Sequence, residues 1–146
     1  MNKITPLISS SEAGPLGVLH LPRLWLKVSL DARALLADGY PAVGTGFDQM
    51  VLDGLGLKKE AVVGFITTQR PTYSEFEDWI KVQPGAKLDK TSITKLNDSL
   101  TGYVHDDETR SGILSEAGVP SHCPFRDAIN LNNLEDWKGF HSAFLK

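Results

Sequence analysis

The stretch His20-Leu-Pro-Arg-Leu-Trp-Leu-Lys27 opens the most apolar helix that the sequence predicts, which runs from Pro22 to about Ala37. Pro22 fits the first helical position, because proline lacks the backbone N–H that has no intrahelical partner there. Apolar residues follow at helical spacing, namely Leu24, Trp25, Leu26, Val28, Leu30, Ala32, Ala34, Leu35 and Leu36. Their stripe is wide, so we expect this helix to be buried on more than one side.

Glycine and proline residues divide the rest of the chain into further short helical segments. The clearest local signal is Thr72-Tyr-Ser-Glu75, a capping box that predicts a helix to about Val82. Further helices are expected at 47–55 and 57–67, around Ile93–Leu100, from Asp106 or Asp107 to Ala117, and from Asn132 or Asn133 to Leu145. Strand-like alternation never extends beyond a few residues. The sequence therefore predicts an all-α fold, a single compact domain of six or seven short helices.

Residues 1–17 differ in composition from the remainder of the chain. They contain three consecutive serines, a Gly-Pro pair and a very short apolar patch at Leu7-Ile8. A secretory signal peptide needs about 7–15 consecutive apolar residues, so this segment does not fit one. The predicted organisation is a mobile leader at residues 1–17 and a single helical domain at residues 18–146.

The overall composition narrows the class of protein. The 146 residues are 41% hydrophobic and 23% charged, with a net charge of −3, as in ordinary globular domains. Lys and Arg are scattered, which disfavours nucleic acid as a partner. Apolar runs fall well short of the ~18 residues that span a bilayer, so no membrane partner is expected. A single cysteine, Cys123, excludes an intramolecular disulfide and fits a cytoplasmic protein.

Two cationic residues stand out in the opening helix. Arg23 and Lys27 are four residues apart, and so lie on one stripe near the helix N-terminus. The helix dipole favours negative charge there, so two cations at this place call for an anion. That anion is either a carboxylate or phosphate ligand or one of the protein's own carboxylates, such as Asp31 or Asp48. The spacing alone leaves both alternatives open.

These residues suggest a function. We expect Arg23 and Lys27 to bind a small anionic molecule in an interhelical pocket, with Trp25 or Trp79 as an apolar wall; burial of both tryptophans in the core is the alternative. Lys27 and Asp48 are candidates for cofactor-free acid–base chemistry of the lyase, isomerase or cyclase type. The alternative for Asp48 is a carboxylate in the first helical turn that the helix dipole stabilises, with no functional role. The competing hypothesis is a non-catalytic protein-interaction module that binds a partner or a second copy of the chain.

Metal and thiol chemistry have weaker support. In His105-Asp-Asp-Glu108, His105 and Glu108 have the spacing of helical metal ligands, but a helix cap explains the acidic cluster equally well. Cys123 could form a nucleophilic pair with His20, His105 or His141, although a lone small thiol usually packs. Dinucleotide and phosphate-loop motifs are absent. We therefore expect no metal and no cofactor.

Several segments, in order, resemble an uncharacterised bacterial domain-of-unknown-function family of small cytoplasmic proteins. They are Gly17-Val-Leu-His-Leu-Pro-Arg-Leu-Trp-Leu-Lys27, Phe47-Asp-Gln, Leu55-Gly-Leu57, Thr72 through Trp79-Ile80, and Leu96-Asn97. Members of that family share a Leu-Pro-Arg-Leu-x-x-Lys helix, an Asp-Gln helix and an acidic segment ending in Trp. The resemblance covers roughly residues 16–135. It implies no accepted activity and no catalytic residues.

The chain departs from the family pattern at two positions. Leu26 stands where an Asp usually precedes the Lys, and Leu96 stands where an aromatic residue usually precedes the Asn. An Asp at position 26 would neutralise Lys27, so its replacement leaves that cation freer for a ligand. The departure also permits a change of role. The resemblance thus directs attention to Arg23, Lys27, Asp48 and Trp79.

Overall fold

Seven α-helices and a terminal π-helical turn make up the fold of residues 2–146, which are the residues that the computed structural model describes. The helices are α1 (Leu21–Ala32), α2 (Phe47–Leu55), α3 (Lys59–Gln69), α4 (Tyr73–Lys81), α5 (Lys90–Thr101), α6 (Asp107–Ala117) and α7 (Ala128–Phe140), and η1 (His141–Leu145) follows α7 directly. Over this range the chain forms isolated β-bridges but no strands. The prediction of an all-α domain with six or seven helices is confirmed.

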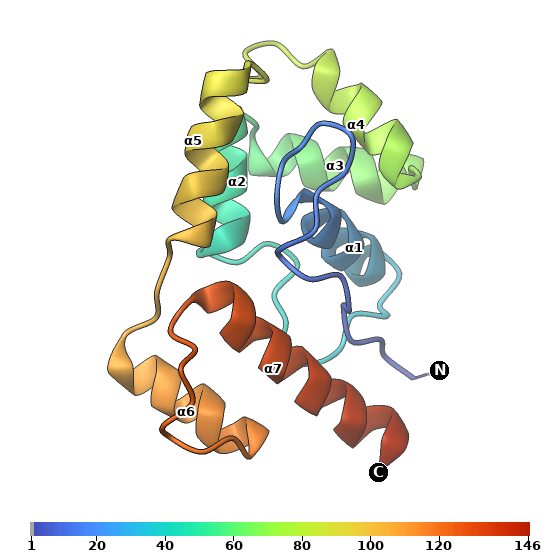
Figure 1. The fold of residues 1–146 in the computed structure, drawn as a ribbon. Helices are drawn as coiled ribbons and strands as arrows, with labels where there is room; N and C mark the ends of the chain where they lie inside the picture. Colours follow the sequence, from blue (N-terminus) through green and yellow to red (C-terminus); the bar gives the residue numbers. More distant parts are fainter. Residues whose placement is uncertain (1) are drawn as a thin grey trace.

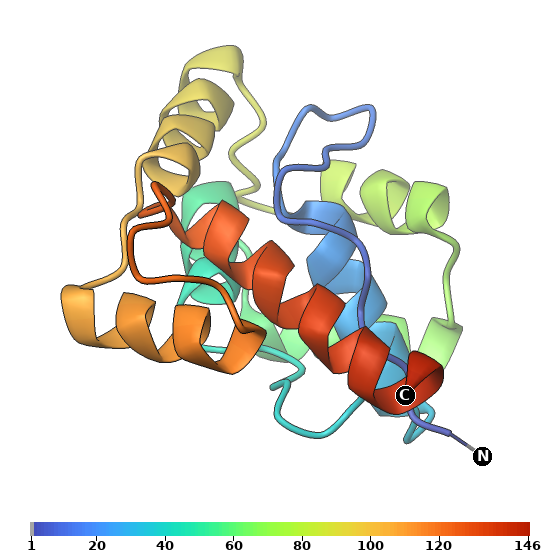
Figure 2. The ribbon, with the colours of Figure 1, turned by 60° about the horizontal axis from the view of Figure 1, so that its bottom comes forward.

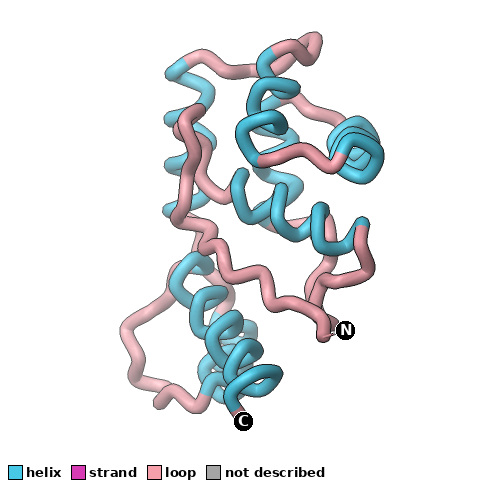
Figure 3. Tube along the Cα trace, turned by 90° about the vertical axis from the view of Figure 1, so that its right-hand side faces the viewer, coloured by secondary structure: helices cyan, strands magenta, loops and turns pink. Residues whose placement is uncertain are grey.

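The helices form two groups that meet around α1. In Figure 1, α2 and α5 lie side by side, α3 and α4 lie near them, and α1 crosses the middle. Helices α6 and α7 pack against each other and lie below the first group, as the side view also shows (Figure 3). Figure 2 shows α7 running across the molecule in front of α1. The facing sides of α1 and α7 carry the site described below.

The core follows the apolar stripes of the helices. Leu24 and Val28 of α1 are buried, as the wide stripe predicted, and Leu21 is buried beside them. They belong to one large cluster, whereas Ile113, Leu114 and Leu131 form a smaller cluster between α6 and α7. The start of α7 joins the large cluster through Ala128 and Ile129, and polar side chains occupy the rest of the boundary between the two groups of helices.

The predicted starts of α4 and α6 are confirmed, because hydrogen bonds in the first turn of each helix cap it as expected. The Thr72 hydroxyl accepts the Glu75 N–H at 3.2 Å, and the Glu75 carboxylate accepts the Thr72 N–H at 3.0 Å, which confirms the capping box of α4. Asp106 caps α6 by accepting the Thr109 N–H at 2.7 Å. Both caps satisfy donors that the first turn of a helix leaves unpaired.

Apart from the ends of α3, which lie two residues later than expected, and the last helix, which continues beyond Phe140 as the η1 turn, two predicted helix boundaries are wrong. Helix α1 ends at Ala32, not near Ala37, because Ala34 adopts a left-handed conformation with φ 57° and the chain then turns extended to pair with Ile4. Helix α7 starts at Ala128, before Asn132, because the Asp127 carboxylate caps it. Neither change alters the number of helices.

The segment before α1 has a defined place against the domain. Thr5 and Ser10 are buried, and Ile4 pairs with the chain after α1 through the Leu35 carbonyl and the Ala37 N–H. Later in the segment, Leu19 donates its N–H to the Asn97 side chain of α5 at 3.0 Å. Within residues 2–17, the Ser9 hydroxyl donates to the Asn133 side chain of α7 at 2.8 Å, and the Leu16 N–H donates to the Glu77 carboxylate of α4 at 3.2 Å.

The helices of residues 2–146 are all too short or too polar to cross a membrane.

Candidate functional site

A cavity of about 260 Å³ lies between α1, the start of α2 and α7, beside the loops at 39–46 and 103–105. Its walls include an unusual set of ionisable side chains: His20, Arg23, Lys27, Asp48, Glu135 and Asp136. All of these except Glu135 are between 3 and 6% exposed. Aromatic side chains complete the wall, with the Phe47 and Tyr103 rings in edge contact at 5.7 Å.

Asp48 is the centre of one polar group. One of its carboxylate oxygens lies 2.6 Å from His20 Nε2, and the other lies 2.5 Å from Lys27 Nζ. The Gly44 N–H donates to that second oxygen at 2.7 Å. Asp48 occupies the first turn of α2, where the helix dipole favours a negative charge. The carboxylate therefore has three donors, two from side chains of α1 or its cap and one from the preceding loop.

These donors determine how Asp48 titrates. Burial alone would raise the pKa of the Asp48 carboxyl, but the hydrogen bonds and charges of His20 and Lys27 outweigh burial and lower the pKa below its usual value. Asp48 is therefore ionised across the physiological range. It is suited to holding a cation and poorly suited to taking up a proton.

His20 has both an unusual backbone and a buried ring. It is the cap residue of α1 and adopts a left-handed conformation, with φ 71°. Its Nδ1 lies 2.8 Å from the Ser10 hydroxyl, so the ring joins the N-terminal segment to Asp48. Burial lowers the pKa of His20, with Lys27 and Arg23 acting in the same direction against the charge of Asp48. A non-glycine residue in this conformation has a conformational cost, which the two hydrogen bonds offset.

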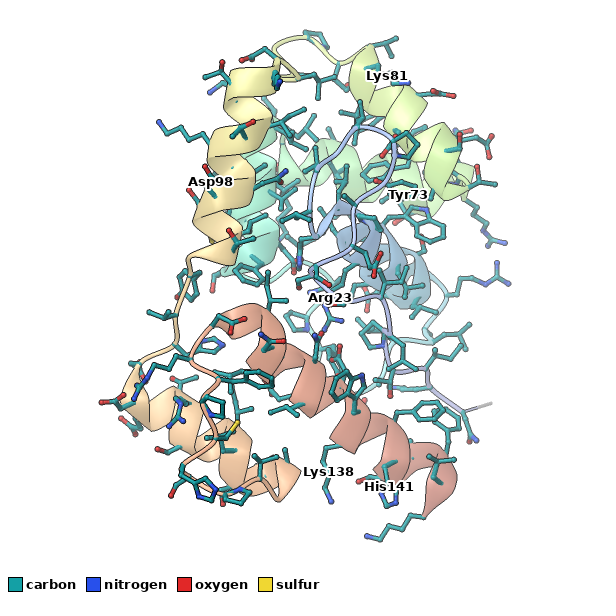
Figure 4. All side chains as sticks on the ribbon, viewed as in Figure 1. Arg23, Tyr73, Lys81, Asp98, Lys138 and His141 are labelled. Carbon is teal, nitrogen blue, oxygen red and sulfur yellow. The ribbon has the colours of Figure 1, made fainter. Side chains whose placement is uncertain are left out.

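Arg23 is the centre of a second polar group. Its Nη1 and Nη2 lie 2.7 and 3.0 Å from the two carboxylate oxygens of Asp136 on α7. Nη1 also lies within hydrogen-bonding distance of the carbonyls of Pro6 and Ile8. The Tyr40 hydroxyl donates to Asp136 at 2.9 Å, and burial followed by the charge of Asp136 raises the pKa of Tyr40. Figure 4 shows the labelled Arg23 side chain between α1 and α7.

Glu135 and His105 belong to a third part of the wall. Glu135 lies at the edge of the cavity, where much of the residue is exposed but its carboxylate is partly buried, and this partial burial, followed by the charge of Asp136, raises its pKa. His105 precedes α6, and its buried Nε2 atom has no hydrogen-bond partner among residues 2–146. This part of the wall is therefore less fully hydrogen-bonded than the Asp48 and Arg23 groups.

The structure brings three of the five predicted site residues together. Arg23, Lys27 and Asp48 all line the cavity. Trp25 instead donates its indole N–H to the Pro71 carbonyl at 3.1 Å, and Trp79 stacks on Phe65 with ring centroids 4.7 Å apart. Both tryptophans pack against the main core, which is the alternative interpretation of the sequence. The wall expected from them is formed by other aromatic side chains, because α1 turns Trp25 away from the stripe of Arg23 and Lys27.

Both cations of α1, Arg23 and Lys27, form ion pairs with carboxylates of the protein itself. Asp48, one of the two expected partners, pairs with Lys27, whereas Asp31 is exposed. Asp136, which the sequence analysis did not single out, pairs with Arg23. Glu135-Asp136 has the pattern of an ordinary acidic pair on a solvent-facing helix, so no local signal distinguishes it.

The other chemical groups considered from the sequence are separate from this arrangement. Across residues 2–146, His, Cys, Asp and Glu side chains do not form a group of three or more with the geometry of a metal site. Cys123 packs in the smaller core, and its backbone carbonyl accepts a hydrogen bond from Arg110. His105 lines the cavity, whereas Glu108 does not.

Comparison with known proteins gives no match from which a function could be inferred, so the interpretation of the site rests on its geometry. The chain matches no protein-family model, and it matches no curated protein.

Proposed function

We propose that the cavity binds a small molecule that carries a carboxylate or phosphate group, and that Lys27 is the residue that contacts this group. The observation that carries the proposal is the convergence of Arg23 and Lys27, both nearly fully buried, on one concave site. A pocket with a few convergent polar groups is the usual form of a small-molecule site. The volume of about 260 Å³ lies below the roughly 300–1,000 Å³ of drug-sized sites, which indicates a small ligand.

Lys27 has donor capacity to spare. An ammonium group carries three N–H donors, and Asp48 is its one acceptor among the described residues. Asp48 for its part also accepts from His20 and Gly44. A ligand anion can therefore share or replace the Lys27 contact without leaving Asp48 unpaired. Arg23 is less available, because Asp136, Pro6 and Ile8 already occupy its guanidinium.

The energetics of burial support a functional role. Removing charged groups from water costs several kcal/mol for each ion, and buried ion pairs often stabilise a fold no more than apolar residues of the same volume would. This site contains two such pairs around one cavity, Lys27–Asp48 and Arg23–Asp136. A purely structural boundary between two helix groups does not require this arrangement, and charged groups around a cavity can serve to bind a polar ligand.

Any acid–base chemistry would divide the roles between two residues. Asp48, with its lowered pKa, would stay ionised and hold Lys27 in place. Lys27 would donate a proton or stabilise negative charge that develops on the ligand. Reactions of the lyase, isomerase or cyclase type use such proton donation and charge stabilisation, and a step that also removes a proton from the ligand needs a base in addition to these two residues.

A thermal-shift assay against small carboxylates and phosphates tests the binding proposal. A ligand at a hundredfold excess over its Kd stabilises the folded state by about 2.7 kcal/mol, which raises the melting temperature clearly. We expect Lys27→Gln to lose the shift, while Lys95→Gln, at an exposed position of α5, keeps it. Circular dichroism establishes that each variant is folded. A panel in which no anion stabilises the wild type would refute the proposal.

The end of the chain favours a second candidate, the protein-interaction module. Trp137, Phe144 and Leu145 are 60, 40 and 65% exposed, and the Phe140 and Phe144 rings are 5.0 Å apart. Exposed apolar side chains close together are typical of contact surfaces. Analytical ultracentrifugation over a range of concentrations tests whether a second copy binds there. Self-association that Trp137→Ser abolishes would support this candidate.

A further inference from the structure

The cavity wall formed by α7 and the 103–105 segment has polar groups that the anion site does not use. Asn132 and Glu135 are three residues apart on α7 and therefore lie on the same face of that helix. His105 lines the same cavity, and its Nε2 atom is buried without a hydrogen-bond partner among the described residues. The wall thus combines a carboxylate, an amide and an imidazole nitrogen with unused hydrogen-bonding capacity.

The unpaired nitrogen of His105 calls for an explanation. Buried polar atoms in folded proteins are nearly always hydrogen-bonded, because an unpaired one loses its hydration without replacement. The His105 ring is held by its backbone N–H, which donates to the Arg126 carbonyl at 3.2 Å, and by edge contact with Tyr103 at 5.9 Å. These contacts place the imidazole in the cavity wall, and a rotation of the ring would let the unpaired Nε2 meet a molecule in the cavity.

We propose that His105 and Glu135 bind a hydroxyl or ammonium group of the same ligand whose anionic group contacts Lys27. This inference rests on the proposed function and specifies its ligand class: small hydroxy acids or amino acids, or the corresponding phosphate esters. A hydroxyl or ammonium group can donate to the Glu135 carboxylate, and His105 can complete the contact as acceptor or donor according to its tautomer. The two ends of the ligand are thus recognised by opposite charges.

The charged groups around Glu135 agree with this assignment. Asp136 and Glu116 act to raise the pKa of Glu135, whereas His105 and Arg23 act to lower it, and shielding from water makes the largest contribution. Asp136 itself is paired with Arg23. A donor group on the ligand would therefore supply the partner that the Glu135 carboxylate does not have among the described residues.

Matched probes separate this inference from the proposed function. One plain anion is propionate, whose hydroxyl and amino analogues are 3-hydroxypropionate and β-alanine. The other is ethyl phosphate, whose analogues are 2-hydroxyethyl phosphate and phosphoethanolamine. Isothermal titration calorimetry measures the ratio of the Kd of each plain anion to the Kd of its hydroxyl or amino analogue. We expect the full chain to bind at least one analogue about tenfold more tightly, the effect of a charge-assisted hydrogen bond.

Variants then assign the preference to residues. Glu135→Gln and His105→Phe should each reduce the ratio to near one, whereas Glu60→Gln and His122→Phe, at exposed positions away from the cavity, should retain the wild-type ratio. Plain anions that bind as tightly as their analogues would overturn the inference and leave the proposed function intact. A preference that survives both cavity variants would also overturn it. If no probe binds, the inference and the proposed function fall together.

Discussion

Arg23 on α1 and Asp136 on α7 form a buried, two-pronged ion pair between residues 113 positions apart in the sequence. The same guanidinium contacts the carbonyls of Pro6 and Ile8. One side chain therefore joins α7 and the N-terminal segment to α1. Because this pair also borders the cavity, the integrity of the site depends on the contact between the two groups of helices.

Removing the charge of Asp136 should destabilise the protein strongly. Asp136→Asn keeps the size of the side chain but leaves the Arg23 guanidinium buried without a countercharge, which typically costs about 3–5 kcal/mol. Urea unfolding at neutral pH measures the free energy of unfolding. The matched control is Asp78→Asn, whose partner Lys81 is 3.5 Å away in an exposed pair, and which should change stability by less than about 1 kcal/mol. Equal small losses in both variants would contradict the prediction.

Stability should fall on mild acidification because of His20. Burial lowers the pKa of this histidine below its ordinary 6.5, so the unfolded chain takes up a proton more readily than the folded one. The contribution is complete above about pH 6.5 and decreases below it, by at most about 1.4 kcal/mol per pH unit. Urea unfolding between pH 7.5 and 5 measures this slope.

Two asparagine variants test the origin of that slope. His20→Asn removes the titrating ring, and asparagine tolerates the left-handed backbone at this position better than most residues, so the variant should show a shallower slope. His122→Asn, at an exposed loop position, should keep the wild-type slope. If His20→Asn retains the full slope, another group causes the pH dependence.

A pair of glycine substitutions should change stability in opposite directions. A Cβ at Gly14 would lie 2.4 Å from Cε2 of Tyr73 and 2.6 Å from Oε2 of Glu77. Those two side chains share a 2.6 Å hydrogen bond, so they resist displacement, and Gly14→Ala should destabilise by about 1–3 kcal/mol. A Cβ at Gly64 of α3 meets nothing within 4 Å, so Gly64→Ala should stabilise by about 0.5–1 kcal/mol. Chemical denaturation measures both; effects of the same sign would show that the packing at Gly14 is wrong.

The affinity for a ligand with a donor group should increase with pH. The pKa of Glu135 is raised above its ordinary 4.5 by shielding from water and by Asp136, and the ionised form is the better acceptor. We therefore expect the ratio of the Kd of β-alanine to the Kd of propionate to decrease from pH 5.5 to 7.5. Taking the ratio cancels carboxylate effects that are common to both ligands. Calorimetry on Glu135→Gln supplies the control, in which this ratio should not vary. A ratio that is constant in the wild type as well as in Glu135→Gln would show that ionisation of Glu135 does not contribute to affinity over this pH range.

Features that depend on neighbouring residues could be predicted from the sequence. The all-α fold, the capping box at Thr72 and the cap at Asp106, one of the two candidates with Asp107, follow from hydrogen bonds and side-chain spacing within one or two turns. The placement of Arg23 and Lys27 on one stripe of α1 follows from the same spacing. These interactions form within a single helix, so their residues carry the information locally.

Tertiary structure alone decided which groups meet in the site. Asp136 reaches Arg23 because α7 packs across α1, and Trp25 and Trp79 lie outside the cavity because their helix faces turn toward the main core. The sequence determined that two cations on α1 need an anion. Packing of distant helices determined that Asp48 and Asp136 supply it, because the energy of a buried charge depends on which carboxylate the fold brings within hydrogen-bonding distance.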